Sequence, residues 1–182
     1  MTARWSICGS LQQYEIYSRC IMKQDRWDRH FLQLCVDHAR MSKDPSTRVG
    51  AVLVGPELVI LASGFNGFPR GVKDTEERLN DRELKNRLVV HAEMNAVLAA
   101  ARVGVPVKGS IIYLAATDAA SSKVWGGPPC TRCTVELIQA GIAGVVTWPF
   151  KDVPSRWADD IAFARGLLQE ANITYREVNP GG

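Results

Sequence analysis

The segment VVHAEMNAVLAAA, residues 89–101, decides the fold around one candidate reaction centre. The alanine-rich run that begins in it, residues 93–102, favours a helix. The apolar run before it, residues 87–90, is typical of a strand. His91 and Glu93 are then expected in the first helical turn, where both side chains can point toward one place. We therefore predict a strand-to-helix junction that sets an imidazole beside a carboxylate.

A second expected helix begins with two thiols. Two prolines, Pro128 and Pro129, precede Cys130, and proline favours the first positions of a helix. Cys133 lies three residues further on, and residues at this spacing share a helix face. Helix N-termini lower the pKa of nearby thiols through their free N–H groups and their dipole. Apolar residues at helical spacing support this helix: Val135, Leu137, Ile138 and Ala140.

Together the two motifs predict a catalytic zinc ion held by His91, Cys130 and Cys133, with Glu93 left to handle protons. Each motif alone has a simpler interpretation. The CxxC pair is compatible with a structural zinc half-site or a redox pair, and the histidine with a capping or core residue. A structural zinc site needs four protein ligands, whereas three leave one position for water. The combination H-x-E and P-C-x-x-C is the signature of zinc-dependent nucleobase deaminases.

The chain resembles the deoxycytidylate (dCMP) deaminases over most of its length, from about residue 27 to 178. HAE and PCxxC are common to the cytidine deaminase superfamily, whereas SKDPST, NGFPRG and HAEMNA are typical of the dCMP branch. The similar runs, in chain order, are SKDPSTRVGAVLV (42–54), GFNGFPRGVKD (64–74), VVHAEMNAVL (89–98) and PPCTRCTVELIQAGI (128–142).

The resemblance implies hydrolytic deamination of dCMP to dUMP with release of ammonia, a step that feeds thymidylate synthesis. Zinc is the implied cofactor. Glu93 is expected to take a proton from the attacking water, pass it to ring N3 and then protonate the departing amine. The family is usually oligomeric and often activated by dCTP and inhibited by dTTP. A homo-oligomer that binds a small nucleotide, with these two possible effectors, is therefore expected.

Four residues are candidates for contact with the substrate. The resemblance assigns Asn66, in the glycine-rich loop 64–71, to the nucleotide sugar, although Asn-Gly is also an ordinary turn sequence. The same loop is associated in the family with a regulatory nucleotide. Backbone N–H groups near Ala92 are expected to orient the pyrimidine. Arg48 and Arg70 are candidates for the phosphate because guanidinium matches phosphate oxygens, and solvated surface arginines are the alternative.

Two departures from the family lie near the expected pocket. Residues 118–127 read as an insertion within an expected loop at 117–129, and the tyrosine-proline usual before VHAE is missing. Trp125, in the insertion, would either stack on a pyrimidine or pin the loop, and we favour pinning. The departures leave other substrates open: dCTP, a 5-substituted dCMP, a free nucleoside or an RNA base. A zinc-binding assembly module without activity is the alternative from another class.

The composition is that of one compact domain. The chain has 182 residues, 46% of them hydrophobic, and a formal net charge of +3 from 22 basic and 19 acidic residues. This mild charge argues against a large nucleic-acid footprint. No apolar run is long enough to cross a bilayer and no leader is evident, so we expect a cytoplasmic protein. Cys8, Cys20 and Cys35 are expected to be plain thiols.

The expected domain spans residues 26–182, and residues 1–25 form an extension of unknown role that we expect to be dispensable before Met22. The charged segment 74–87 is interpreted as a solvated loop or short surface helix rather than a lid. His30 and His38 are expected to be structural.

A helix between the last two strands predicts that they are parallel. The expected fold is a three-layer α/β/α cytidine deaminase-like fold with a mixed five-stranded sheet. Its other elements are helices at 27–41 and 155–171, a hairpin of 49–54 and 58–63, and strands at 111–116, 144–148 and 173–178.

Overall fold

The fold is built on one mixed sheet in the strand order β2-β1-β3-β5-β6. The computed structural model describes residues 11–151 and 155–179, without the side chains of residues 11–23, 155 and 156. β1 pairs antiparallel with β2 and β3, whereas β5 is parallel to both β3 and β6. The predicted mixed sheet and the parallel last pair are confirmed, and a short sixth strand, described below, adds to the five predicted strands. The strands are β1 (Thr47–Val54), β2 (Ile60–Phe65), β3 (Ile111–Asp118), β5 (Gly144–Thr147) and β6 (Thr174–Glu177), with a short turn η1 (Pro56–Leu58) in the hairpin.

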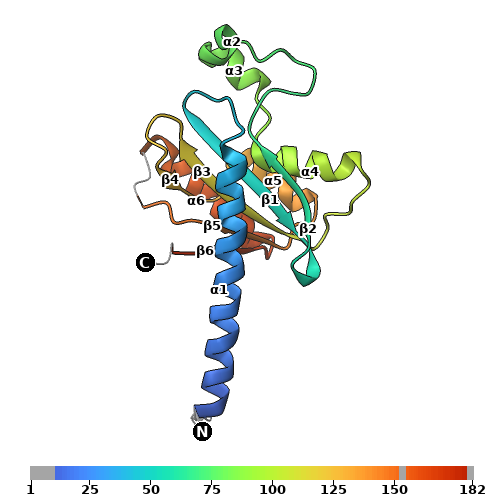
Figure 1. Ribbon diagram of the computed structural model, residues 1–182, viewed down its shortest axis with the longest axis vertical. Coiled ribbons are helices and arrows are strands. Elements are labelled where there is room, and N and C mark those ends of the chain that lie inside the picture. Colours follow the sequence, from blue (N-terminus) through green and yellow to red (C-terminus); the bar gives the residue numbers. More distant parts are fainter. Residues whose placement is uncertain (1–10, 152–154, 180–182) are drawn as a thin grey trace.

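One face of the sheet is covered by α1 (Leu11–Ala39). Its buried side chains include Phe31 and Cys35, which pack on Val52 and Tyr113 of the sheet. Gly50 permits this close packing, because a Cβ there would lie 1.9 Å from the Cys35 carbonyl oxygen. The helix is longer than the one predicted at 27–41, and Figure 1 shows its N-terminal end projecting well beyond the rest of the chain.

This length bears on the predicted N-terminal extension. Residues 11–25 belong to the same helix as the start of the predicted domain, whereas residues 1–10, with Cys8, lie outside the described part of the chain. The side chain of Cys20 lies outside it as well. Cys35 is a free, buried thiol, as predicted. Among the described helices, none combines the length and the apolar character that crossing a membrane would need.

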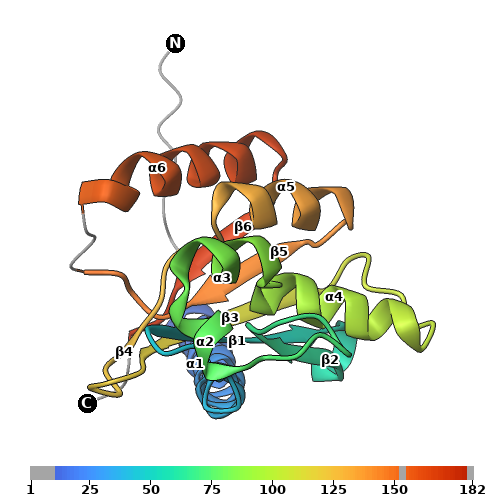
Figure 2. The same cartoon turned by 90° about the horizontal axis from the view of Figure 1, so that it is seen from above.

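The other face of the sheet is covered by three helices, α4 (Ala92–Arg102), α5 (Thr131–Gln139) and α6 (Ser155–Glu170). Figure 2 shows them on the opposite side from α1, which confirms the three-layer α/β/α arrangement. Gly64 in β2 permits α4 to lie close, because a Cβ there would come within 2.5 Å of the Ala96 nitrogen. The core on this face consists mainly of Ala51, Leu53, Ala92, Ala96, Ile112, Leu114, Leu137, Val145 and Leu168.

The predicted strand at residues 87–90 is wrong. The charged segment before it forms two short helices, α2 (Glu76–Asn80) and α3 (Arg82–Leu88), and the second includes half of the predicted strand. The side chains of Thr75 and Asp81 cap these helices by accepting the N–H groups of Arg78 and Leu84. Only Val90 forms a bridge, with Gly67. Of the two predicted alternatives for this segment, a short helix rather than a loop is confirmed, and Figure 1 shows both helices at one end of the molecule.

The predicted loop at residues 117–129 is partly wrong as well. β3 continues to Asp118, and a short sixth strand, β4 (Val124–Trp125), folds back antiparallel on it. The Asp118 carboxylate accepts the N–H groups of Ala120 and Ser121, which closes the turn between the two strands. The apparent insertion is therefore a hairpin, and its register places Trp125 opposite Ala116.

Candidate metal centre and its cavity

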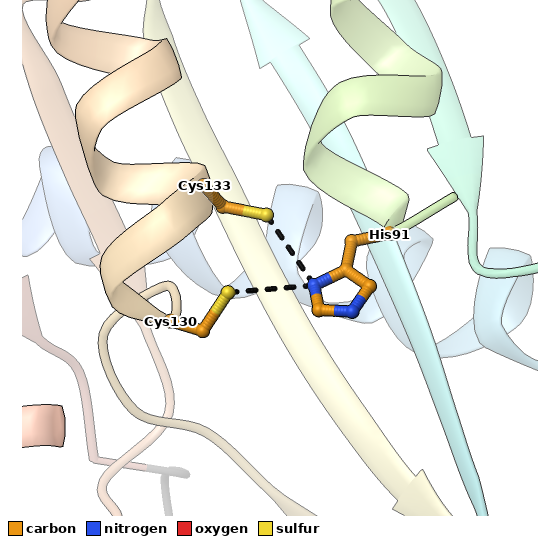
Figure 3. A group of neighbouring side chains, drawn as sticks. All are labelled: His91, Cys130 and Cys133. Carbon is orange, nitrogen blue, oxygen red and sulfur yellow. Dashed lines mark hydrogen bonds between the residues drawn. The ribbon is translucent and has the colours of Figure 1, made fainter. Parts of the chain in front are cut away.

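Three side chains from two helix starts lie together near the carboxyl-terminal halves of β3 and β5. His91 is the N-cap of α4, and Cys130 is the N-cap of α5. Figure 3 shows both sulfurs facing Nδ1 of the imidazole, which lies 3.5 Å from Sγ of Cys130 and 3.4 Å from Sγ of Cys133. Among the described residues, these three form the one group of histidine, cysteine and acidic side chains arranged to bind a metal ion.

The spacing of these atoms fits zinc. Tetrahedral zinc has bonds of about 2.3 Å to sulfur and about 2.0–2.1 Å to nitrogen, so its sulfur and nitrogen ligands lie about 3.5 Å apart. The nitrogen-to-sulfur distances at His91 agree with this value. Two thiolates and an imidazole are also the donor types that zinc prefers. The predicted ligand set His91, Cys130 and Cys133 is positioned to bind a metal.

The protonation of the metal-free ligands reflects how closely they lie. A hydrogen bond from Cys133 lowers the pKa of Cys130 and in turn raises the pKa of Cys133, so the two thiols share one proton. A hydrogen bond to the Cys130 sulfur raises the pKa of His91 to about 9, against the opposing effect of burial. Metal binding must displace such protons, because thiolate and neutral imidazole are the binding forms.

Glu93 lies beside the three ligands without belonging to their set. The residue is 6% exposed, in the first turn of α4. Burial raises the pKa of its carboxyl, while the positive charge of His91 and a hydrogen bond from Cys133 act in the opposite direction. A buried carboxyl with a raised pKa is suited to taking up and giving back a proton near neutral pH.

A cavity of about 850 Å³ opens in front of this centre. His91, Glu93 and Cys130 line it, together with residues at the start of β1, in α3, and around β4 and α6. Three aromatic rings stand on one wall. Trp125 is stacked on Phe150 with ring centroids 4.7 Å apart, and its centroid lies 5.8 Å from that of Trp157.

The N-terminus of α5, which carries the thiols, is fixed from α6. The Asp160 carboxylate accepts the Thr131 N–H at 3.2 Å and the Thr131 hydroxyl at 2.6 Å. Thr131 directly follows Cys130 in the chain. Asp160 thus caps α5 from another helix and holds the turn that contains both sulfurs.

Residues 25–148 match a family model described as the cytidine and deoxycytidylate deaminase zinc-binding region. The chain belongs to this family. It is 32% identical over 161 residues to the deoxycytidylate deaminase of Homo sapiens, a match that covers 85% of this chain and 80% of the relative. It is also 32% identical over 150 residues to an uncharacterized deaminase of Aliivibrio fischeri, covering 81% of this chain and 90% of that protein.

Solved structures of this deaminase family share the fold. The apo dCMP deaminase of the cyanophage S-TIM5 superposes with a TM-score of 0.58 at 21% identity, covering 82% of this chain and 95% of that one. The same cyanophage enzyme in complex with dCMP and dUMP superposes with a TM-score of 0.53, covering 93% of this chain and 98% of that one. The predicted family and fold class are confirmed, and the chain is an enzyme of the hydrolase type.

Within this deaminase cavity, Asn66 and Ala92 have the predicted location. Both line the cavity. Asn66 is 5% exposed, and its amide accepts the Val49 N–H at 2.7 Å and donates to the Thr47 carbonyl at 2.9 Å. It therefore joins the glycine-rich loop to the start of β1. Ala92 is the first residue of α4, where backbone N–H groups have no partner within the helix. Contact of either residue with a nucleotide stays a prediction.

Arg48 and Arg70 do not line the cavity, so the phosphate role predicted for them gains no support from its geometry. Arg48 is half-buried and donates from Nε to the Asp44 carbonyl at 3.3 Å, while Arg70 is exposed. The cationic side chains that do line the cavity, besides His91, are Arg82 and Lys85 of α3. Sequence reasoning missed both because it placed this charged segment on the solvent-facing surface. Their spacing of three residues was the available signal.

The structure also bears on three other sequence interpretations. Trp125 packs on Phe150 and Trp157, which supports the prediction that it holds its loop in place. It also lines the cavity. His38 contacts the Leu34 carbonyl through Nδ1 at 2.9 Å, and His30 packs edge-on against Trp27. Both histidines are on α1, across the sheet from the metal centre, in agreement with a structural role.

Proposed function

We propose that this chain is a zinc-dependent enzyme that converts dCMP and water to dUMP and ammonia. The observation that carries the proposal is Glu93, a buried carboxyl that lines the same cavity as His91 and Cys130 without being one of the three metal-binding side chains. A structural zinc site would use a fourth protein ligand and would need no such neighbour. A hydrolytic site needs an open coordination position and a proton carrier beside it.

The residues of the chain have separate roles in this proposal. A zinc ion held by His91, Cys130 and Cys133 would supply Lewis-acid activation of water at neutral pH. Glu93 takes the proton from the attacking water and delivers it to ring N3 as the new bond to C4 forms. It then takes the remaining proton from the new hydroxyl on C4 and gives it to the amine, so that the C4 carbonyl forms as ammonia leaves. The N–H groups at the start of α4 orient the pyrimidine, and Asn66 contacts the sugar.

The choice of dCMP rests on the relatives. The deaminases of human, mouse and orangutan that match this chain are named for deoxycytidylate, and the cyanophage enzyme of the same fold binds dCMP and dUMP. The test is ammonia release from equal concentrations of dCMP, dCTP, 5-methyl-dCMP, deoxycytidine and a cytidine-containing RNA. We expect the highest kcat/KM for dCMP. Equal or higher values for any of the others would reassign the substrate.

A catalytically inactive zinc-binding module is the contrasting outcome of the same panel. Zinc at one equivalent per chain together with no ammonia release from any of the five substrates would favour it. The buried Glu93, which is not one of the metal-binding residues, argues against that outcome. Burying an ionisable carboxyl costs free energy, and a module without activity has no use for such a group.

Four further features are proposed. The family resemblance implies that the enzyme forms a homo-oligomer and that it is activated by dCTP and inhibited by dTTP. The sequence further indicates that it works in the cytoplasm and that the residues before Met22 are dispensable for the reaction. Light scattering on the purified protein tests the first, and assays with each triphosphate test the second. A chain truncated to begin at Met22 tests the last, and loss of activity in that chain would refute it.

A further inference from the structure

The charged side chains around the cavity are almost all paired. Asp44 forms an ion pair with Lys85, and its two oxygens lie 3.1 and 3.0 Å from the ammonium nitrogen. Asp160 is engaged by Thr131. His91 and Glu93 belong to the metal centre. Arg82 is the exception: in the described part of the chain its guanidinium has neither a hydrogen-bond acceptor nor an ion-pair partner, and it faces the cavity.

The position of Arg82 is set by Lys85. Lys85 lies three residues further along α3, so the two side chains share one face of the helix. The Lys85 ammonium donates to Asp44 and to the Ser46 hydroxyl at 3.2 Å, and its side chain is only 13% exposed. This contact ties α3 to the segment before β1. It leaves Lys85 with little capacity for a ligand and directs Arg82 over the same opening.

Stability does not explain an arginine at this position. Arg82 is the first residue of α3, and the helix dipole disfavours a cation there. Other arginines of the segment are paired: Arg87 on the same helix contacts Glu83 at 2.6 Å. An unpaired guanidinium at the mouth of a cavity, at a position that costs helix stability, indicates a ligand that is itself anionic.

We propose that Arg82 binds the phosphate monoester of the nucleotide substrate and so makes the enzyme select nucleotides over nucleosides. This rests on the proposed function. Deamination requires the base to lie beside His91, Glu93 and Cys130, so the sugar phosphate extends along the rest of the cavity, which Arg82 also lines. Guanidinium presents paired donors that match phosphate oxygens. Ser46 and Thr47 line the same cavity, and their hydroxyls supply further donors.

The test compares dCMP with deoxycytidine in the zinc-loaded full chain. Arg82→Gln should lower kcat/KM for dCMP by about 10- to 100-fold, mostly through KM, as expected for loss of charge-assisted hydrogen bonds. It should change kcat/KM for deoxycytidine less than twofold. Arg87→Gln is the matched control, on the same helix but outside the cavity, and should leave both values unchanged.

The outcomes separate this proposal from the one on which it rests. A wild-type enzyme that prefers dCMP, together with an Arg82→Gln variant that keeps the preference, overturns the phosphate role alone. A wild-type enzyme with no preference for dCMP over deoxycytidine overturns the proposed substrate. Calorimetry with dUMP and deoxyuridine gives a readout independent of turnover: selective loss of dUMP affinity in Arg82→Gln supports the subsite, and unchanged dUMP affinity refutes it.

Discussion

Lys85 and Asp44 form a nearly buried ion pair, with Nζ 3.0 Å from Oδ2 and side chains that are 13% and 11% exposed. The pair joins α3, from the middle of the chain, to the turn before β1. Asp44 also accepts the N–H groups of Ser46 and Thr47. One carboxylate therefore organises the turn and anchors the helix that forms one wall of the cavity.

This arrangement predicts a pH-dependent contribution to stability. Burial alone raises the pKa of Asp44, but the Ser46 amide, the Lys85 ammonium and the Thr47 amide together outweigh it, so the pKa is lowered. A carboxyl whose pKa is lowered in the folded state stabilises that state above its unfolded pKa of about 3.9. The contribution is lost as pH falls through the lower, folded-state pKa.

Asp44→Asn should therefore reduce the free energy of unfolding at pH 7 by about 1–3 kcal/mol. The difference from the wild type should shrink as the pH falls below about 4, and it should vanish only below the lower folded-state pKa, where the native carboxyl is protonated too. Urea unfolding of the metal-free proteins at several pH values measures this. Asp37→Asn, in an exposed pair with Arg40, is the control and should have little effect at any pH. A pH-independent difference at Asp44 would contradict the assignment.

Glu93→Gln should retain zinc and lose turnover. The substitution keeps the shape of the side chain and removes its ability to accept a proton, so kcat should fall by about 10²- to 10⁴-fold. Zinc content by elemental analysis should stay at one equivalent per chain. Cys133→Ser provides the contrast, because it removes a ligand and should lose both zinc and activity. Ordinary turnover in Glu93→Gln would exclude this residue as the proton carrier.

Asp160→Asn should weaken zinc binding, although Asp160 is on α6 and is not itself a metal ligand. The carboxylate accepts both the N–H and the hydroxyl of Thr131, and loss of such a cap typically costs about 0.5–2 kcal/mol. The turn that carries Cys130 and Cys133 then becomes less well ordered. We expect a lower zinc affinity in a chelator competition titration, with near-normal kcat once zinc is saturating. Asp159→Asn, the exposed neighbour, should behave as the wild type. Equal zinc affinities in the two variants would refute this positioning role.

Trp125→Ala should destabilise the β4 hairpin more than it affects the chemical step. The indole packs on Phe150 and Trp157, and aromatic pairs contribute about 0.5–1.5 kcal/mol beyond the area they bury. Thermal unfolding should therefore shift downward, while kcat changes little. Val124→Ala, an exposed residue of the same strand, should shift it less. A large rise in KM for dCMP with unchanged thermal stability would instead indicate stacking on the pyrimidine.

The sequence by itself determined the features that depend on neighbours along the chain. The prolines before Cys130 and the alanine-rich run after His91 mark helix starts, and both helices begin within one residue of the expected position. The ligand set of the metal centre follows, because two such starts carry its three donors. Apolar runs separated by turns predicted the strands, and the helix between the last two predicted their parallel pairing.

Only the tertiary structure decided which residues surround the cavity. Leu88 belongs to an apolar run with the composition of a strand, yet it is the last residue of α3, a helix that begins at the Asp81 cap. Trp125 becomes part of a strand because Ala116 of β3 offers it a partner, and no local pattern encodes that pairing. Arg48, Arg70 and Arg82 are chemically equivalent in the sequence. Which of them faces the metal centre depends on how the Lys85–Asp44 pair docks α3, a contact between residues 41 positions apart.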